Sequence, residues 1–164
     1  MEIRQAVTSD FARVTEIYAY ARTFMVKMGN PTQWAGGYPS DAIIRADIQN
    51  GSLYVLEESG QLHGVFAFFP EGDSAYDAIP SFGEKGVPYG AIHRVASAGT
   101  AKGVLAAIVA FCLARRPCLK IDTHKDNTVM QRALERQGFV SFGTFKIPNV
   151  GERILYQRLK ESIE

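Results

Sequence analysis

Apolar residues in the first half of the chain recur at two spacings, and each spacing is typical of one kind of secondary structure. Residues 3–7, with Ile3, Gln5 and Val7 at every second position, are interpreted as a strand, whereas the apolar residues between Phe11 and Met25 fall on one face of a helix. The pattern predicts, in order, a strand at 3–7, a helix capped within residues 8–10 and ended by Gly29, a loop at 29–39, a shorter helix capped by Ser40 and ended by Gly51, and a hairpin of strands at 52–57 and 62–69.

The second half begins with a long loop at 70–88 and then alternates strands with helices. The helix predicted at 102–116 is apolar almost all round, so we expect it to lie buried against a sheet. The elements predicted here are, in order, a strand at 89–97, the helix at 102–116, a strand at 119–123, a helix capped by Asp126 or Asn127 and ended at Gln137, and strands at 139–146 and 153–159. The order β-α-α-β-β-β-α-β-α-β-β predicts a mixed sheet of the α/β (α+β) class.

The composition fits a globular chain and excludes several classes of function. The 164 residues suit one domain, which we place at residues 1–164. Lys plus Arg number 18 and Asp plus Glu number 17, so a net charge of +1 indicates neither nucleic acid nor an anionic membrane as a partner. No apolar run reaches the roughly 18 residues that span a bilayer. Residues 1–5 lack the apolar core of a signal peptide, and two cysteines make no disulfide framework, so we expect a cytoplasmic protein.

Small residues fill the junction between the strand at 89–97 and the next helix, which reads VASAGTAKGVL over residues 95–105. The first N–H groups of a helix have no partner within it, and with the helix dipole they attract anions. Lys102 adds a positive charge, so the junction suggests a cradle for a pyrophosphate. It has neither the spacing of a Walker loop nor a G-x-G-x-x-G motif, and a plain connection between a strand and a helix is the alternative.

Three short motifs stand at the ends of predicted elements. They are G-N-P-T-Q-W at residues 29–34, H-R at 93–94 and D-T-H at 122–124, and Asn127 is followed by Leu134 and by Gly138-Phe139. With the order of elements, these features resemble the GNAT superfamily of N-acetyltransferases, and within it a bacterial subgroup that carries the three short motifs. The resemblance covers most of the chain. It implies a mixed, mostly antiparallel sheet flanked by helices.

The resemblance also implies that the chain binds acetyl-CoA as its acyl donor. The backbone of residues 95–97 would pair with the pantetheine arm like an added strand, with Val95 nearest the thioester. The residues implied in donor binding are Val95, Ala96, Ser97, Thr100, Ala101, Lys102, Gly103, Val104 and Asn127.

Three positions depart from the pattern of the superfamily. Thr100 stands where Gln or Arg is usual, and Leu105 stands where a second Gly or Ala is usual. Leu134 replaces the Tyr with which many members protonate the departing thiolate. A second hypothesis is therefore a non-catalytic acyl-CoA-binding or interaction module on the same fold. A third is that only the fold is shared and that another small polar ligand binds.

Direct acetyl transfer needs a base for the arriving ammonium group, and the strand before the junction contains no Asp or Glu. His93 is the base that this strand offers, because an imidazole titrates near neutral pH. Asp122 and His124 alternate along the next strand, so we expect them to face one side and, by the resemblance, to form a polar cluster with His93. His124, Tyr156 or a water would protonate the thiolate. Alternatively, His93 and Arg94 bond structural carboxylates, and Asp122 and His124 fix a turn.

The loop at 29–39 offers groups for the acceptor, because this region often covers the acceptor in GNAT folds. Aromatic rings beside amides can hold a small amine or the end of a peptide. The candidate acceptor-binding residues are Asn30, Gln33, Trp34 and Tyr38, with Tyr76, Asp77 and Glu84 of the loop at 70–88 as a source of charge. Alternatively, Trp34 fills the core.

The histidines and cysteines lack the spacing of metal ligands, so we expect no metal site. The function predicted from the sequence is acetyl-CoA-dependent transfer of an acetyl group to a primary amine of a small molecule or peptide. The sequence identifies neither the acceptor nor the oligomeric state, and a homodimer is compatible with it.

Overall fold

Seven strands form a mixed sheet in the computed structural model, which describes residues 1–83 and 85–161. Their order across the sheet is β1-β2-β3-β4-β5-β7-β6, and each neighbouring pair is antiparallel except β4 and β5, which are parallel. The mostly antiparallel mixed sheet is therefore confirmed. The strands are β1 (Glu2–Gln5), β2 (Leu53–Glu58), β3 (Gln61–Phe69), β4 (Tyr89–Ser97), β5 (Cys118–Thr123), β6 (Val140–Ile147) and β7 (Gly151–Leu159).

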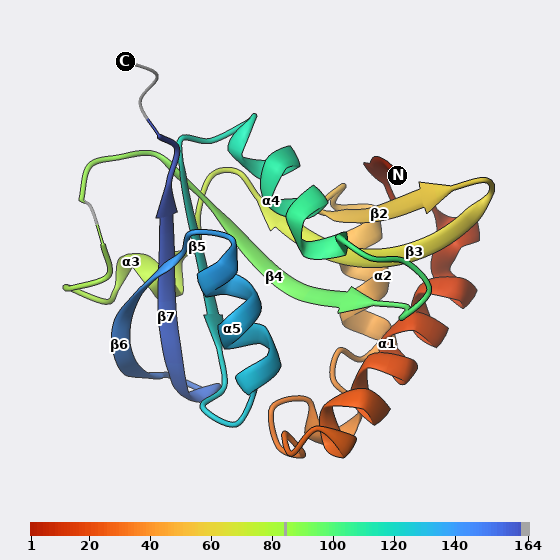
Figure 1. Ribbon diagram of the computed structural model, residues 1–164, viewed down its shortest axis with the longest axis horizontal. Helices are drawn as coiled ribbons and strands as arrows, with labels where there is room; N and C mark the ends of the chain where they lie inside the picture. Colours follow the sequence, from red (N-terminus) through yellow and green to blue (C-terminus); the bar gives the residue numbers. More distant parts are fainter. Residues whose placement is uncertain (84, 162–164) are drawn as a thin grey trace.

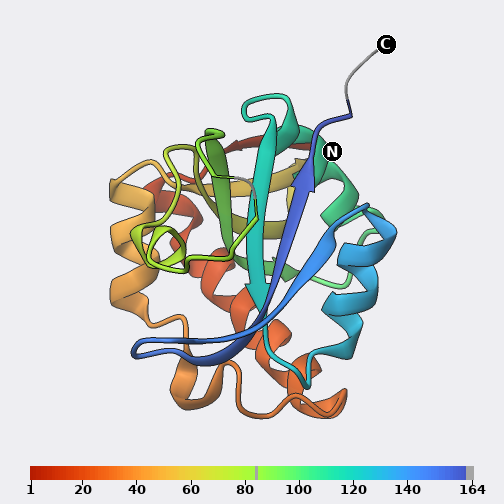
Figure 2. The ribbon, with the colours of Figure 1, turned by 90° about the vertical axis from the view of Figure 1, so that its left-hand side faces the viewer.

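Helices cover both faces of this sheet (Figures 1 and 2). Helices α1 and α2 pack on one face and α4 and α5 on the other, and each pair buries its own apolar cluster against the strands. The helices are α1 (Phe11–Lys27), α2 (Asp41–Gln49), α3 (Ser74–Asp77), α4 (Val104–Leu113) and α5 (Thr128–Arg136), with 3-10 turns at Thr8–Asp10 and Ala35–Gly37. Apart from the short α3 and the 3-10 turns, the order of elements is the predicted one.

The predicted caps of the second and last long helices are confirmed. The side chains of Ser40 and Asn127 each accept a hydrogen bond from the backbone N–H three residues later, at 3.3 and 3.1 Å. The start of α1 differs from the prediction, because residues 8–10 form a 3-10 turn. The Asp10 carboxylate accepts a hydrogen bond from the backbone N–H of Val7 instead of capping the helix.

Helix α4 is shorter than the predicted helix at 102–116. It begins at Val104 because Gly103 has a left-handed backbone (φ 75°), which a helical residue cannot have. It ends at Leu113, where the chain turns toward Pro117 and β5. Residues 100–102 therefore form a loop, and Lys102 is exposed in it.

The loop predicted at 70–88 contains the short helix α3. Asp73 caps this helix by accepting a hydrogen bond from the backbone N–H of Ala75 at 2.8 Å. The backbone N–H of Asp73 in turn donates to the Tyr89 hydroxyl at the start of β4 (3.0 Å). A helix of four residues is too short to show a helical period in the sequence, so the pattern could not predict it.

Strands β4 and β5 run side by side only near their beginnings. Residues 89–91 of β4 pair with residues 118–120 of β5, and beyond that the two strands diverge (Figure 1). Among residues 1–83 and 85–161, no strand pairs with the side of β4 that faces β5 over Ile92 to Ser97. The splayed pair that the resemblance implies is thus confirmed, and it leaves backbone N–H and C=O groups of β4 ready to pair with an extended ligand.

Candidate functional site

A β-bulge in the middle of β4 shapes the site. Two residues of β4, Arg94 and Val95, lie opposite the single residue Phe66 of β3. Arg94 has a φ of 51°, which is uncommon for a residue with a side chain. Its carbonyl accepts a hydrogen bond from the Tyr18 hydroxyl of α1 (2.8 Å), and its guanidinium donates two to the Asp47 carboxylate of α2 (2.8 and 3.1 Å). Two helices on one face of the sheet therefore hold the bulge in place.

Two cavities meet beside this bulge. The larger has a volume of about 640 Å³ and lies between the splayed strands, α3 and the loop at 29–39. The smaller has a volume of about 230 Å³ and lies between α1, the start of α4 and α5. The residues that line both are Met25, Val95, Asn127 and Met130. Val95, which the resemblance places nearest the thioester, therefore lies at the junction of the two cavities.

The smaller cavity collects five of the nine predicted donor-binding residues. Those that line it are Val95, Ala96, Ser97, Val104 and Asn127. Those that do not line it are Thr100, Ala101, Lys102 and Gly103, which form the loop before α4. Most of the remaining lining residues are apolar, and Asp126 is the one charged residue among those that line it.

The loop before α4 is held by contacts that the sequence analysis did not predict. Thr100 Oγ1 lies 2.6 Å from His63 Nδ1 of β3. Gly99 packs so closely against α1 that a β-carbon at this position would collide with the Tyr20 side chain. The loop is therefore fixed beside α1 and β3, although Thr100 stands where the superfamily usually has a longer side chain.

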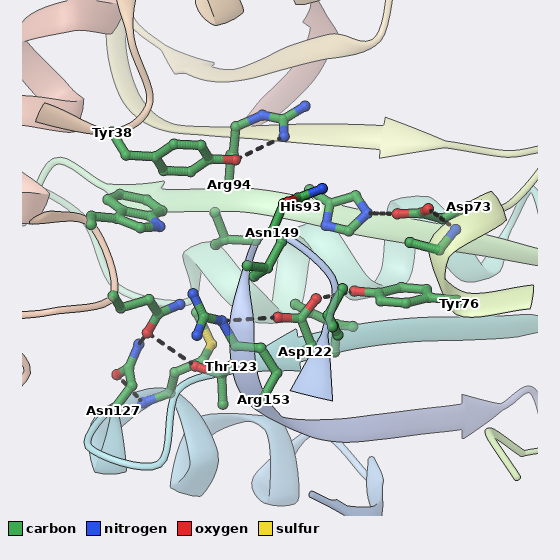
Figure 3. Close-up of a pocket in the computed structure, with 18 of the residues that line it drawn as sticks. Tyr38, Asp73, Tyr76, His93, Arg94, Asp122, Thr123, Asn127, Asn149 and Arg153 are labelled. Carbon is green, nitrogen blue, oxygen red and sulfur yellow. Dashed lines mark hydrogen bonds and ion pairs between the residues drawn. The ribbon is translucent and has the colours of Figure 1, made fainter. Parts of the chain in front are cut away.

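Polar side chains from distant parts of the chain meet in the larger cavity (Figure 3). His93 Nε2 lies 2.7 Å from Asp73 Oδ2. This hydrogen bond holds the pKa of Asp73 below its usual value, against the opposing effect of partial burial, so the carboxylate is ionised at neutral pH. The rings of Tyr76 and Phe69 pack against the imidazole, with centroids 5.3 and 5.7 Å away.

Asp122 faces the same cavity from β5. One of its carboxylate oxygens accepts a hydrogen bond from the Tyr76 hydroxyl, and the other lies 3.4 Å from Nε of Arg153 on β7 (Figure 3). Burial, reinforced by the Asp122 charge, raises the pKa of Tyr76 well above its usual value, so this phenol stays a donor. His93 and Asp122 therefore belong to one polar cluster, as predicted, and Tyr76 lies between them.

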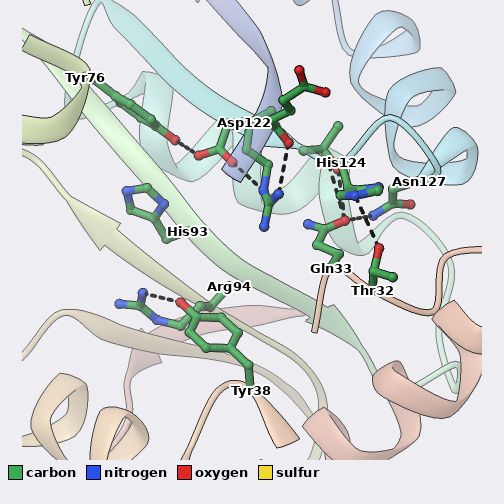
Figure 4. A network of polar contacts seen from close by, with 12 residues as sticks. Thr32, Gln33, Tyr38, Tyr76, His93, Arg94, Asp122, His124 and Asn127 are labelled. Carbon is green, nitrogen blue, oxygen red and sulfur yellow. Dashed lines mark hydrogen bonds and ion pairs between the residues drawn. The ribbon is translucent and has the colours of Figure 1, made fainter. Parts of the chain in front are cut away.

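His124 is not part of this cluster, and here the prediction is wrong. Strand β5 ends at Thr123, so the alternation that would place His124 on the side of Asp122 no longer applies. His124 Nε2 lies 3.2 Å from Thr32 Oγ1, and its Nδ1 accepts a hydrogen bond from the backbone N–H of Asp126 at 3.1 Å (Figure 4). Burial lowers the pKa of His124, and nearby positive charge adds to that effect. These contacts fit the alternative in which His124 fixes a turn.

One oxygen atom joins the loop at 29–39 to the start of α5 (Figure 4). Gln33 Oε1 accepts hydrogen bonds from Nδ2 of Asn30 and Nδ2 of Asn127, each at 3.0 Å. The backbone N–H of His124 (3.4 Å) and the hydroxyl of Thr123 (3.5 Å) also point at it. Asn127 cannot reverse its amide, because its oxygen caps α5. Residues predicted for the acceptor and a residue predicted for the donor therefore form one network.

The four predicted acceptor-binding residues separate in the structure. Gln33, Trp34 and Tyr38 line the larger cavity, whereas Asn30 lines the smaller one. Trp34 is 8% exposed and packs edge-on against Tyr18, with ring centroids 5.6 Å apart. Both interpretations of Trp34 therefore apply, since it fills the core and also borders the cavity.

Asp73 and Arg153 are the charged residues of the cavity that the sequence analysis missed. Asp73 carries a signal, since an Asp before a short run of helix-compatible residues is a typical cap. Arg153 carries none, because its position depends on where β7 joins the sheet. Of the residues predicted to supply charge, Tyr76 lines the cavity, Asp77 does not, and Glu84 lies outside the described residues.

No cluster of three or more His, Cys, Asp or Glu side chains within residues 1–83 and 85–161 could hold a metal ion. No helix in that part of the chain is both long and apolar enough to cross a membrane.

No protein-family model and no curated protein matches the chain, but solved structures do. A GNAT-family acetyltransferase from Streptococcus agalactiae is 28% identical, with a TM-score of 0.85 over 98% of this chain and 96% of that one. The yncA protein of Salmonella typhimurium, solved with its cofactor acetyl-CoA, is 18% identical, with a TM-score of 0.66 over 100% and 96%. The ribosomal-protein-alanine N-acetyltransferase of Brucella melitensis is 17% identical, with a TM-score of 0.60 over 97% and 99%. The chain therefore has the GNAT fold and is similar over almost its whole length to solved structures of GNAT-family acetyltransferases.

Proposed function

We propose that the protein is an acetyltransferase that moves an acetyl group from acetyl-CoA to a primary amine of a small molecule or peptide. The observation that carries this proposal is the position of Val95, at the junction of a mostly apolar cavity and one lined by both polar and apolar side chains. A transferase needs such a junction, because donor and acceptor must meet at one point from two sides. We propose further that residues 1–164 act as one catalytic domain in the cytoplasm, which the sparse cysteines of the sequence support.

The residues of the smaller cavity fit acetyl-CoA in three respects. Its largely apolar walls suit the pantetheine arm. The side of β4 with no strand beside it offers backbone groups from Ile92 to Ser97 to the amides of that arm. The first turn of α4, with Val104 and Leu105 at the edge of the cavity, offers N–H groups to a pyrophosphate. When bound, acetyl-CoA would supply an activated thioester.

On the acceptor side, we propose that His93 acts as the base. Its imidazole lines the larger cavity two residues before Val95. His93 would take a proton from the ammonium group of the acceptor, and the freed amine nitrogen would then bond to the carbonyl carbon of the thioester while the C–S bond breaks. The nitrogen would release its second proton to solvent, which leaves the neutral amide and the thiolate. The backbone of the bulge at Val95 would hold the carbonyl oxygen.

Neither of the side chains that the sequence suggested as an acid, His124 or Tyr156, is placed to protonate the thiolate. Leu134 is fully buried in an apolar cluster. Tyr156 is 2% exposed, and burial raises the pKa of its hydroxyl. Neither Tyr156 nor His124 lines either of the two cavities. We therefore propose that the thiolate leaves without a side-chain acid and takes its proton from solvent, which a thiol pKa of about 8.5 permits.

The larger cavity supports a small acceptor. Its volume of about 640 Å³ falls within the range of small-molecule sites. A peptide end remains part of the proposal, since one structural neighbour is named as a ribosomal-protein-alanine N-acetyltransferase. The carboxylates of Asp73 and Asp122 face this cavity, and both suit an acceptor that arrives as a cation.

The proposed function is tested by calorimetric titration with acetyl-CoA and CoA, followed by a screen of primary amines for thiol release. We expect saturable binding, and at 100 times its Kd the ligand should stabilise the protein by about 2.7 kcal/mol. Replacing the base, His93→Gln, should lower turnover about 10²- to 10⁴-fold and leave acetyl-CoA binding unchanged. Unchanged turnover in this variant would remove His93 from the mechanism, and a folded protein that binds no acetyl-CoA would refute the proposal.

Leu134 supports a second candidate function, a non-catalytic acyl-CoA-binding module. Its fully buried side chain stands where many members of the superfamily have a Tyr that serves as the acid. Tight acetyl-CoA binding without thiol release for any amine in the screen would favour this module over the enzyme.

A further inference from the structure

Both the side chain and the backbone of Asp73 are held by hydrogen bonds where Asp73 contacts His93. Asp73 uses one carboxylate oxygen to cap α3, by accepting from the N–H of Ala75 (2.8 Å), and the other to reach His93 Nε2 (2.7 Å). Its backbone N–H donates to the Tyr89 hydroxyl (3.0 Å). Gly72 before it lies against the Tyr89 ring, where a β-carbon would come within 2.8 Å of the ring. These contacts hold the Asp73 carboxylate in an orientation that faces His93.

This geometry determines which nitrogen of His93 carries the proton. An ionised carboxylate can only accept hydrogen bonds, so the nitrogen that faces Asp73, Nε2, must be the donor. In the neutral imidazole Nδ1 then has the lone pair. Nδ1 has no hydrogen-bond partner among the described residues, and Figure 3 shows the imidazole lying between the Asp73 carboxylate and the open part of the cavity.

We infer that Asp73 is a positioning residue that holds His93 in the Nε2–H tautomer, so that Nδ1 is the atom that accepts the proton of the acceptor amine. This inference rests on the proposed function for its chemistry, whereas the tautomer itself does not. Asp73 stays ionised while His93 takes the proton on Nδ1, and the imidazolium then has one N–H toward Asp73 and one toward the cavity. The proton leaves from Nδ1 to solvent, and the starting tautomer returns.

The other groups around His93 do not compete for this role. Tyr76 of α3 and Phe69 of β3 present their rings to the imidazole. The hydroxyl of Tyr76 donates to Asp122, and that carboxylate also pairs with Arg153 of β7. The neighbouring Arg94 is bound to Asp47 on α2. Among the described residues, the carboxylate that contacts the imidazole is therefore Asp73.

The substitution Asp73→Asn makes the inference testable without any assay of activity. An Asn side chain has one oxygen, which is required by the N–H of Ala75, so its NH₂ group would face Nε2 of His93. Nε2 would then be the acceptor, and the proton of the neutral imidazole would move to Nδ1. Asn is as good a helix cap as Asp, so α3 should keep its structure.

The experiment is ¹⁵N NMR of the imidazole nitrogens in protein labelled at histidine, at a pH where the imidazoles are neutral. His93 is assigned by the loss of its signals in His93→Gln. We expect the Nε2–H tautomer in the wild type and the Nδ1–H tautomer in Asp73→Asn. The control Glu71→Gln alters a carboxylate two residues away that pairs with Arg116 outside the cavity, and should leave the tautomer unchanged. An Nδ1–H tautomer in the wild type, or no change in Asp73→Asn, would overturn the inference.

Kinetics then link the tautomer to the reaction. Asp73→Asn should lower kcat by about 10²- to 10⁴-fold, with the Kd for acetyl-CoA unchanged. Asp73→Ser keeps a capping oxygen but is too short to reach the imidazole, and should give a mixture of tautomers with an intermediate kcat. If Asp73→Asn changes the tautomer and kcat stays the same, the catalytic role of Nδ1 is wrong. If the tautomers behave as expected and no amine is acetylated even by the wild type, the positioning role stands and the proposed function fails.

Discussion

The two cavities that meet at Val95 are built in opposite ways. The smaller one is largely apolar, and what it offers a ligand is mainly backbone, from the side of β4 with no strand beside it and the first turn of α4. The larger one is lined by polar side chains that come from several strands, α3 and two loops. A backbone site needs only the right succession of elements, whereas a side-chain site needs particular residues in particular places. Under the proposed function, the donor side would therefore depend mainly on the succession of elements, and the acceptor side on particular side chains.

Asp47→Ala should cause the largest loss of stability among these variants, because Asp47 supports the bulge that borders both cavities. Removing it would leave the largely buried guanidinium of Arg94 without its carboxylate partner, at a cost of about 3–5 kcal/mol in the free energy of unfolding. Urea unfolding measures this loss. The control Asp41→Ala, in the exposed first turn of the same helix, should cost less than about 1 kcal/mol. Equal losses in the two variants would contradict the role of the ion pair.

Gln33→Leu should have the second largest effect on stability. It should also affect both cavities, because Gln33 contacts residues of each. The substitution removes the acceptor of two side-chain amides and should lower the free energy of unfolding by about 1–3 kcal/mol. Because Asn127 loses a partner, acetyl-CoA should also bind more weakly, although Gln33 lines the acceptor cavity. Unfolding and calorimetry test the two effects. Gln49→Leu, at an exposed position, should stay within about 0.5 kcal/mol of the wild type. Unaltered acetyl-CoA binding in Gln33→Leu would show that the two sides are independent.

Thr100→Val should sharpen the comparison, because it acts on the donor side alone. It removes one hydrogen bond, to His63, and should cost about 0.5–1.5 kcal/mol in the free energy of unfolding. The KM for acetyl-CoA should rise, while the KM for the amine stays constant. Steady-state kinetics with each substrate varied in turn provides the measurement. A change confined to the KM of the amine would reverse the assignment of the two cavities.

The smallest effect concerns His124 and pH. Burial lowers the pKa of His124 below its unfolded value of about 6.5, so the unfolded chain binds the proton more readily. The contribution of the neutral imidazole to stability is therefore present above about pH 6.5 and is lost as the pH falls toward the folded pKa. Thermal unfolding between about pH 7.5 and about pH 5.5 should show a smaller loss of Tm in His124→Gln than in the wild type. An equal loss of Tm in the two proteins would mean that protonation of His124 does not contribute to the pH dependence of stability.

The parts of the molecule that could be predicted from the sequence are those fixed by local pattern. The bounds of β4, the caps at Ser40 and Asn127, and the splayed strands beside His93 are confirmed. The rest depends on contacts between distant residues. Asp73 meets His93 across 20 positions of sequence, in a segment too short to show a period. His124 follows the last residue of β5, and one residue decides whether strand alternation still applies to it.

The Gln33 network also sets a rule for redesign of this protein. The loop at 29–39 borders the larger cavity, which we propose holds the acceptor, so it is the segment to exchange when a different amine is wanted. One atom of that loop, Gln33 Oε1, also sets the orientation of the Asn127 amide at the start of α5. A loop grafted from another protein would therefore bring a new acceptor surface and, unless it keeps an amide oxygen at this point, a disturbed donor site. Variants that change Trp34 and Tyr38 but keep Asn30 and Gln33 should differ in the amine that they prefer and should bind the donor as tightly as the wild type.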